Sequence, residues 1–131
     1  DFFQNADLSD ANNYSPAGLP TSGSDLLLTT ASTALTLNGT SLSMSSLNQI
    51  NNSTYTISNG SMMLFPLNGN VVGAATNDAI YLGGSSSNLT IETSLSLTGS
   101  NLDVAQAGAI LNISGAITVS TSRNTASSAT A

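Results

Sequence analysis

The chain has no cysteine, no histidine and no tryptophan among its 131 residues, and lysine is missing as well. Arg123 is the single basic residue, and charged residues make up 6% of the sequence, against roughly 25% in an ordinary soluble domain. Without histidine or lysine there is no general base for a nucleophilic triad, and without cysteine or histidine there is no zinc site. Without lysine, the Lys–Asn cross-links of some surface fibres are also impossible. Most catalytic and covalent machinery is therefore excluded.

The net charge of −6 excludes further partners. Nucleic-acid binding depends on Lys and Arg to displace counterions from phosphates, and an anionic membrane surface is a poor partner for the same reason. The longest apolar run is far shorter than the roughly 20 residues that a membrane-spanning helix needs. Neither nucleic-acid binding nor membrane insertion is expected.

The seven acidic residues form no recognisable site. Glu92 and Asp103 are the two within the patterned region that could act as a pair of glycosidase carboxylates, and each is better explained as a solvated or turn-capping residue. Calcium-binding repeats of the Gly-Gly-x-Gly-x-Asp type do not occur. The sequence therefore predicts a protein that is not an enzyme, with no catalytic residue, no metal site and no cofactor.

Short apolar runs alternate with Ser, Thr and Asn from residue 25 onward, and 40% of all residues are hydrophobic. An alternation of period two is typical of half-buried strands, and the Asn-Gly and Gly-Gly pairs between the runs are typical of tight turns. The sequence therefore predicts an all-β chain. The expected strands are Leu26–Leu28, Leu35–Leu37, Leu42–Met44 with Leu47, Tyr55–Ile57, Met62–Leu67, Val71–Val72, Ile80–Leu82, Leu89–Ile91, Leu95–Leu97, Leu102–Val104, Ile110–Ile113 and Ile117–Val119.

Three strand-like segments recur in the same order along the chain. Residues 35–37 match residues 89–91, residues 40–44 match residues 93–97, and residues 55–58 match residues 111–114, at offsets of 54, 53 and 56. A repeat of this kind with Gly and Asn at its corners favours a β-solenoid, in which the offset spans two or three coils. An antiparallel β-sandwich or jelly roll, which also has many short strands, is the alternative.

Composition divides the chain into three parts. Residues 1–24 hold two of the three prolines and two of the three phenylalanines, and we expect an extended N-terminal arm there, or a segment that folds back as a cap. Residues 25–122 form the β-repeat domain. Residues 123–131 are expected to be a flexible Ser/Thr/Ala tail.

One segment resembles a known family. Tyr14-Ser15-Pro16-Ala17-Gly18-Leu19-Pro20, followed by Asp25-Leu26-Leu27-Leu28, is similar to the lead-in of bacterial autotransporter-type repeat proteins. In those proteins an aromatic-Ser-Pro-x-Gly-x-Pro turn and an Asp precede the first solenoid strand. The resemblance implies a right-handed β-helix displayed at the cell surface.

The C-terminal part of the β-repeat domain lacks the residues that normally block strand pairing. Residues 110–122 contain no charge and no proline, whereas isolated β-proteins protect open strand edges with charges, prolines or covering elements. We therefore expect a secreted structural subunit that self-assembles non-covalently, head to tail, into an extracellular fibre or surface layer. The candidate end residues are Ile113, Ile117 and Val119, and the candidate arm residues are Phe2, Phe3, Tyr14, Pro16 and Pro20.

The alternative function is an adhesin or carbohydrate-binding stalk module, in which rows of Ser, Thr and Asn contact surface glycans. Such a composition, free of cysteine and lysine, fits the outside of a microbial cell. N-glycosylation sequons are numerous, because Asn, Ser and Thr are so common. The candidate acceptors are Asn38, Asn52, Asn88 and Asn112.

Overall fold

The computed structural model describes residues 2–3, 6–65, 78–98 and 101–119. The expected strand Val71–Val72, the end of the expected strand Met62–Leu67 and the 123–131 tail lie outside these residues.

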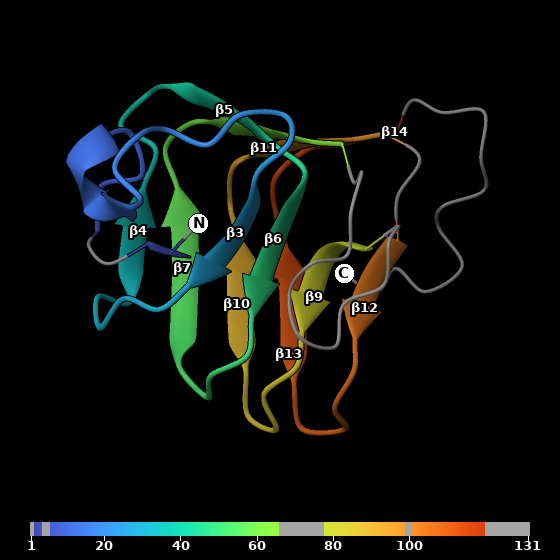
Figure 1. The fold of residues 1–131 in the computed structure, drawn as a ribbon. Helices are drawn as coiled ribbons and strands as arrows, with labels where there is room; N and C mark the ends of the chain where they lie inside the picture. The colour runs from blue at the N-terminus through green and yellow to red at the C-terminus, as the bar shows by residue number, and fades with distance from the viewer. Residues whose placement is uncertain (1, 4–5, 66–77, 99–100, 120–131) are drawn as a thin grey trace.

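The protein is all-β, with one short 3₁₀ helix, η1 (Ala11–Asn13), in the described part of the chain. The strands form three sheets, here called A, B and C (Figure 1). Sheet A contains β1 (Phe2–Phe3), β2 (Tyr14–Ser15), β3 (Asp25–Leu28), β6 (Ser46–Gln49), β9 (Asp78–Leu82) and β12 (Asn101–Val104). Sheet B contains β4 (Ala34–Thr36), β7 (Thr54–Ser58), β10 (Asn88–Ile91) and β13 (Ile110–Ile113). Sheet C contains β5 (Ser41–Met44), β8 (Ser61–Leu64), β11 (Ser94–Leu97) and β14 (Ile117–Val119).

From β3 onward, consecutive strands go to sheets A, B and C in turn, so the chain forms successive triplets. The first triplet is β3–β5, the second β6–β8, the third β9–β11 and the fourth β12–β14. Each strand pairs in parallel with its counterpart in the next triplet, and β1 with β2 is the one antiparallel pair that the described strands make. Parallel pairing rules out the antiparallel sandwich or jelly roll. The arrangement is compatible with a β-solenoid.

The repeat seen in the sequence corresponds to two triplets. Ser41 pairs with Ser61 and Ser61 with Ser94, which is the expected offset of 53. Tyr55 aligns through Leu89 with Leu111, which is the expected offset of 56. The match of 35–37 to 89–91 was wrong by two positions, because strand pairing aligns residue 35 with residue 91. A shift of two keeps the same face of the strand inward, so the apolar pattern alone could not detect it.

Alternate residues of each strand point inward and stack in columns between the triplets. One column of sheet B runs through Leu35, Ile57 and Ile91, all buried. Residues of all three sheets belong to one hydrophobic cluster, so the core lies between the sheets. In Figure 1, sheets A and B face each other and sheet C lies along the top.

The corners between sheets B and C explain two of the Asn-Gly pairs. Asn38 and Asn59 both have positive φ, 52° and 64°, and the amide of Gly39 donates to the carbonyl of Asn59 at 2.7 Å. Asn tolerates this left-handed conformation better than most residues. Gly60 is required for a different reason, since a Cβ there would collide with Leu37.

A polar network fills the corner between sheets A and B. The hydroxyl of the buried Tyr55 donates to the carbonyl of Thr30 at 2.7 Å and accepts from the Asn51 side chain at 2.9 Å. Asn51 also donates to the carbonyl of Leu28, and Gln49 donates to its side-chain oxygen. The network links the first and second triplets and pairs the Tyr55 hydroxyl, which would otherwise be costly to bury, whereas the Oε1 atom of Gln49 is buried without a hydrogen-bond partner.

The N-terminal segment folds back onto the first triplet. Strand β1 pairs in parallel with β3, and the amide of Leu8 donates to the carbonyl of Thr36 on β4 at 2.8 Å. Leu8 and Tyr14 are buried in the core. The buried side chains of Leu8 and Tyr14 thus cover the open end of the core.

Candidate assembly surfaces

The fourth triplet ends all three sheets on the C-terminal side. Strands β12, β13 and β14 each have one neighbour, and no described residue pairs with their outer edges. An unpaired parallel edge presents a row of amide and carbonyl groups to which another strand can add. This surface, formed by β12, β13 and β14, is called the C-terminal edge below.

Apolar side chains are exposed at the C-terminal edge. In sheet C, Leu95 and Leu97 are 1% and 4% exposed, whereas their neighbours in the next triplet, Ile117 and Val119, are 42% and 47% exposed. The inward-facing column is thus uncovered where it ends. Ile113, the third candidate end residue, is half-buried and packs against the core.

Ile110 is a further exposed apolar residue that the sequence reasoning did not select. It is 48% exposed and pairs with Asn88 in a column of outward-facing residues of sheet B. The sequence indicates this exposure, because Ile110 and Leu111 are adjacent in a strand and successive side chains point to opposite faces.

The backbone groups at the outer edge of β14 can be assigned from the ladder. The amide of Leu95 donates to the carbonyl of Ala116 at 2.8 Å, so residues 116 and 118 bond to β11. Alternate residues of a parallel strand bond to opposite neighbours. The amide and carbonyl groups of Ile117 and of the residue at position 119 therefore face the outer edge.

At the N-terminal end the three sheets are not equally covered. Strand β1 lies on the outer side of β3, and residues 6–8 lie on the outer side of β4. No described strand pairs with the outer side of β5. The carbonyl of Thr40 accepts from the amide of Ser61 at 3.1 Å, and the carbonyl of Met44 accepts from the amide of Phe65 at 2.9 Å. Because alternate residues of a parallel strand bond to opposite sides, the backbone groups of Ser41 and Ser43 face the outer side of β5.

The candidate arm residues have different positions in the cap. Tyr14 is buried, and its hydroxyl donates to the carbonyl of Leu8 at 2.7 Å. Pro20 is buried and Pro16 is exposed. Phe2 and Phe3 form β1 on the outer side of β3. Of these residues, Tyr14 belongs to the hydrophobic core and helps to close its N-terminal end.

Two pKa values within the cap are perturbed. Burial, with a smaller contribution from the charge of Asp7, raises the pKa of the Tyr14 hydroxyl well above its ordinary value. Hydrogen bonds from the side chain and the amide of Ser9 lower the pKa of Asp7. The cap is thus adapted to a neutral tyrosine beside an ionised carboxylate.

The raised pKa of Tyr14 predicts a loss of stability at alkaline pH. The folded protein keeps this proton to a higher pH than the unfolded chain, so the free energy of unfolding falls as pH rises above about 10, the ordinary tyrosine value. Urea unfolding between pH 8 and pH 11 measures the decline. The variant Tyr14→Phe is expected to be less stable at pH 8, because it loses the bond to Leu8, and to decline less steeply. Equal slopes in the two proteins would contradict the assignment.

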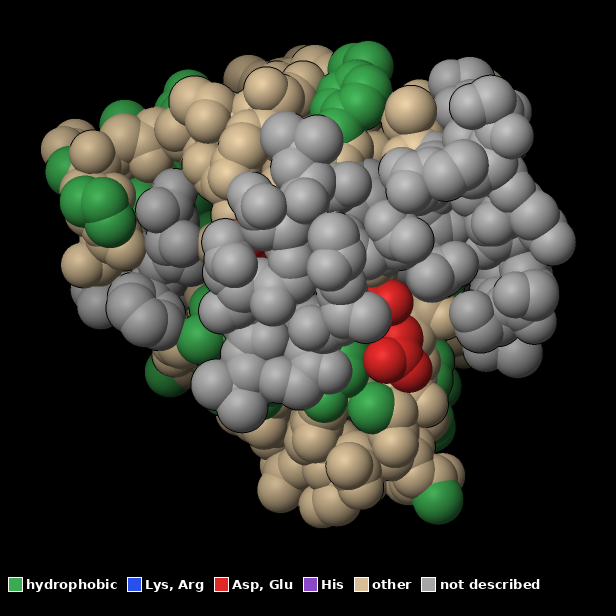
Figure 2. All heavy atoms as spheres, turned by 45° about the vertical axis from the view of Figure 1, so that its right-hand side comes forward, with side chains coloured by type: hydrophobic (Ala, Val, Ile, Leu, Met, Phe, Trp, Pro, Cys, Tyr) green, Lys and Arg blue, Asp and Glu red, His purple; other side chains and the backbone are tan. Residues whose placement is uncertain are grey.

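The acidic residues are not brought together as a catalytic pair. Glu92 follows β10 in sheet B and is exposed, whereas Asp103 lies on β12 in sheet A. Among the described residues, no three metal-ligating side chains form a group that could hold an ion, and no helix is long and apolar enough to cross a membrane. The described charged side chains visible in Figure 2 are all acidic.

The glycosylation candidates differ in accessibility. Asn38 is exposed in its turn and Asn112 is exposed on β13, whereas Asn88 is half-buried at the start of β10. Asn52 is exposed, but its side-chain oxygen accepts from the amide of Ser86 at 3.0 Å. Asn38 and Asn112 therefore have the more accessible amides.

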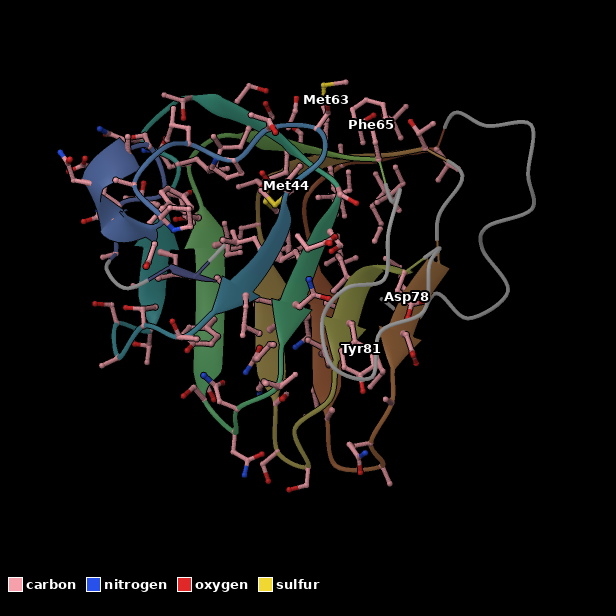
Figure 3. The ribbon with its side chains drawn as sticks, in the orientation of Figure 1. Met44, Met63, Phe65, Asp78 and Tyr81 are labelled. Carbon is pink, nitrogen blue, oxygen red and sulfur yellow. The ribbon has the colours of Figure 1, made fainter. Side chains whose placement is uncertain are left out.

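The outer face of sheet C carries a shallow groove of about 280 Å³ lined mainly by hydroxyl-bearing residues. Its lining includes Ser61, Ser94, Ser96 and Thr118 together with the large apolar residues Met62, Met63 and Leu95. Figure 3 shows Met63 projecting from this face, while Met44 points into the core. The groove offers hydrogen-bond donors and acceptors beside an apolar surface, and no described charge lines it.

Comparison of the chain with models of known protein families, with curated proteins and with solved structures found no match.

Proposed function

We propose that the chain is a right-handed β-solenoid whose triplets are its coils, and that it acts as a secreted structural subunit. It self-assembles non-covalently, head to tail, into an extracellular fibre or surface layer. The single observation that carries the proposal is the difference between the two ends: a capped N-terminal end and a C-terminal edge with which no described strand pairs. The right hand follows from the strong preference for right-handed crossovers between parallel strands of one sheet.

The C-terminal edge has two features that favour association. Ile110, Ile117 and Val119 are exposed there, and burial of a side chain of this size contributes about 1.5–3 kcal/mol. Strands β13 and β14 carry no charged residue and no proline. Proteins that remain monomeric block such edges with charges, prolines or covering elements.

The test is the concentration dependence of the native protein's size. Sedimentation velocity and electron microscopy are expected to show species that grow with concentration and that dissociate on dilution. A constant monomer over the whole range would refute self-assembly.

A second candidate, the adhesin or carbohydrate-binding module, is favoured by the groove on sheet C. The serine hydroxyls can form hydrogen bonds with a sugar ring, and Met63 can make apolar contact with the same ring. Binding of the monomeric protein to a glycan array, without concentration-dependent assembly, would favour this function over the first.

A further inference from the structure

We infer that β14 of one copy pairs in parallel with β5 of the next copy, so that sheet C alone runs continuously from subunit to subunit. This inference rests on the proposed function and identifies the surface that receives the C-terminal edge. Sheets A and B are covered on the N-terminal side by β1 and by residues 6–8. Strand β5 is the edge strand of the first triplet whose outer side no described strand covers.

The hydrogen-bonding groups of the two edges are complementary. The outer edge of β14 offers the amide and carbonyl groups of residues 117 and 119, and β5 offers those of Ser41 and Ser43. In a parallel ladder, a residue forms its hydrogen bonds with the residues immediately before and after the one that lies directly opposite it. Ile117 opposite Leu42 would therefore bond to Ser41 and Ser43, as the ladder requires.

The same register continues the side-chain columns of sheet C. Within one copy, Leu42, Met62, Leu95 and Ile117 form one column, because each pairs with the next. Placing Ile117 opposite the next copy's Leu42, which is already 4% exposed within its own copy, continues this column in register and covers part of the 42% exposed Ile117 side chain. On the outer face, Thr118 would then lie over the next copy's Ser43.

Charge distinguishes sheet C from sheet A as the joining sheet. Neither β5 nor β14 contains a charged residue. In sheet A, β3 begins with Asp25 and β12 contains Asp103, so joining β12 to the N-terminal end would bring like charges together. The net charge of −6 opposes association in general, and a junction of β14 with β5 places no charged residue of one strand opposite one of the other.

The cap affects the shape of the assembly. Sheet A extends by the two strands β1 and β2 beyond β3, which adds about 10 Å at the strand spacing of 4.7–4.9 Å. Because this addition lies on the side of sheet A and not of sheet C, successive copies are tilted and do not share one axis. A tilted head-to-tail contact produces a ring or a helical filament.

Disulfide trapping in this cysteine-free chain tests the pairing directly. Ser43→Cys and Thr118→Cys are prepared as separate proteins, mixed in equal amounts and oxidised. Directly opposed residues on adjacent strands lie close enough for a disulfide. The expected product is a dimer that contains one copy of each variant. Circular dichroism of each variant confirms that its β-structure is unchanged.

Two controls use the same outward-facing column, in which Ser96 pairs with Thr118 inside one chain. The double variant Ser96→Cys/Thr118→Cys is expected to form an intramolecular disulfide, which verifies the oxidation conditions. Ser96→Cys mixed with Thr118→Cys is expected to give no mixed dimer, because position 96 lies on an internal strand.

The outcomes separate this inference from the proposed function. If the native protein assembles but the 43–118 mixture gives no mixed dimer, the sheet C pairing is wrong while self-assembly stands. Self-linked dimers of Thr118→Cys alone would likewise overturn it, because they indicate contact between two C-terminal edges. A native protein that stays monomeric at every concentration refutes both.

Discussion

Replacing Ile57 by alanine is expected to lower the free energy of unfolding by about 2–5 kcal/mol, because it opens a cavity in the centre of the core. Ile57 is fully buried and lies in the column between Leu35 and Ile91. Neighbours on both sides prevent the cavity from closing, so we expect the loss of free energy of unfolding in the upper part of this range. Urea unfolding followed by circular dichroism measures the change.

Val119→Ala is the matched control for Ile57→Ala. Both residues are β-branched and lie in inward-facing columns, but Val119 is 47% exposed at the end of its column. Its replacement is expected to cost less than about 1 kcal/mol at concentrations where the protein is monomeric. Equal losses for the two variants would contradict a core that is continuous in the centre and uncovered at its C-terminal edge.

Replacing Ile117 by lysine is expected to abolish self-assembly while leaving the monomer folded. Ile117 is 42% exposed in the free subunit, so a lysine there can remain hydrated until a partner covers it. Association would then remove an apolar contact and desolvate an unpaired ammonium group, at a combined cost of several kcal/mol. A loss of about 3 kcal/mol corresponds to a dissociation constant about a hundredfold higher.

Thr54→Lys is the control for charge alone. Thr54 is exposed on β7, a central strand of sheet B, so this variant gains the same charge away from both ends. Sedimentation velocity at one concentration is expected to show assembly of the native protein and of Thr54→Lys, and monomers of Ile117→Lys. Undiminished assembly of Ile117→Lys would show that the C-terminal edge is not the contact.

The position of the N-terminal segment could not be decided from its residues. Phe2, Phe3 and Tyr14 are equally suited to anchoring on another copy and to covering their own first triplet. The structure contains the second arrangement, in which Leu8 and Tyr14 join the core. The hydrogen bonds between residues 6–8 and β4 join backbone atoms, so no pattern of side chains in the sequence predicts them.

Two further features of the fold also lay beyond the sequence. Asn48 and Tyr81 occupy the face of sheet A opposite the core, yet both are buried, so sheet A has no simple polar outer face. Gln49 occupies an inward-facing position of β6 and is fully buried, where the alternation predicted an apolar residue. Its side-chain nitrogen donates to the carbonyl of Ser53 and to the side-chain oxygen of Asn51, while its side-chain oxygen has no hydrogen-bond partner.

The sequence by itself determined the all-β class, the position of nearly every described strand and a repeat at offsets of 53 to 56 residues, because period-two alternation is a local property that neighbouring residues express together. It also determined that the chain has no histidine, lysine or cysteine and a single basic residue, Arg123. Only the tertiary structure decided that the strands pair in parallel, that the N-terminal segment caps sheets A and B, and that no described strand pairs with the outer edges of β5 and β14. Those features depend on which strand edges pair, and the paired strands are far apart in the sequence. The sequence does not specify this pairing, because every residue except proline carries the same backbone donor and acceptor.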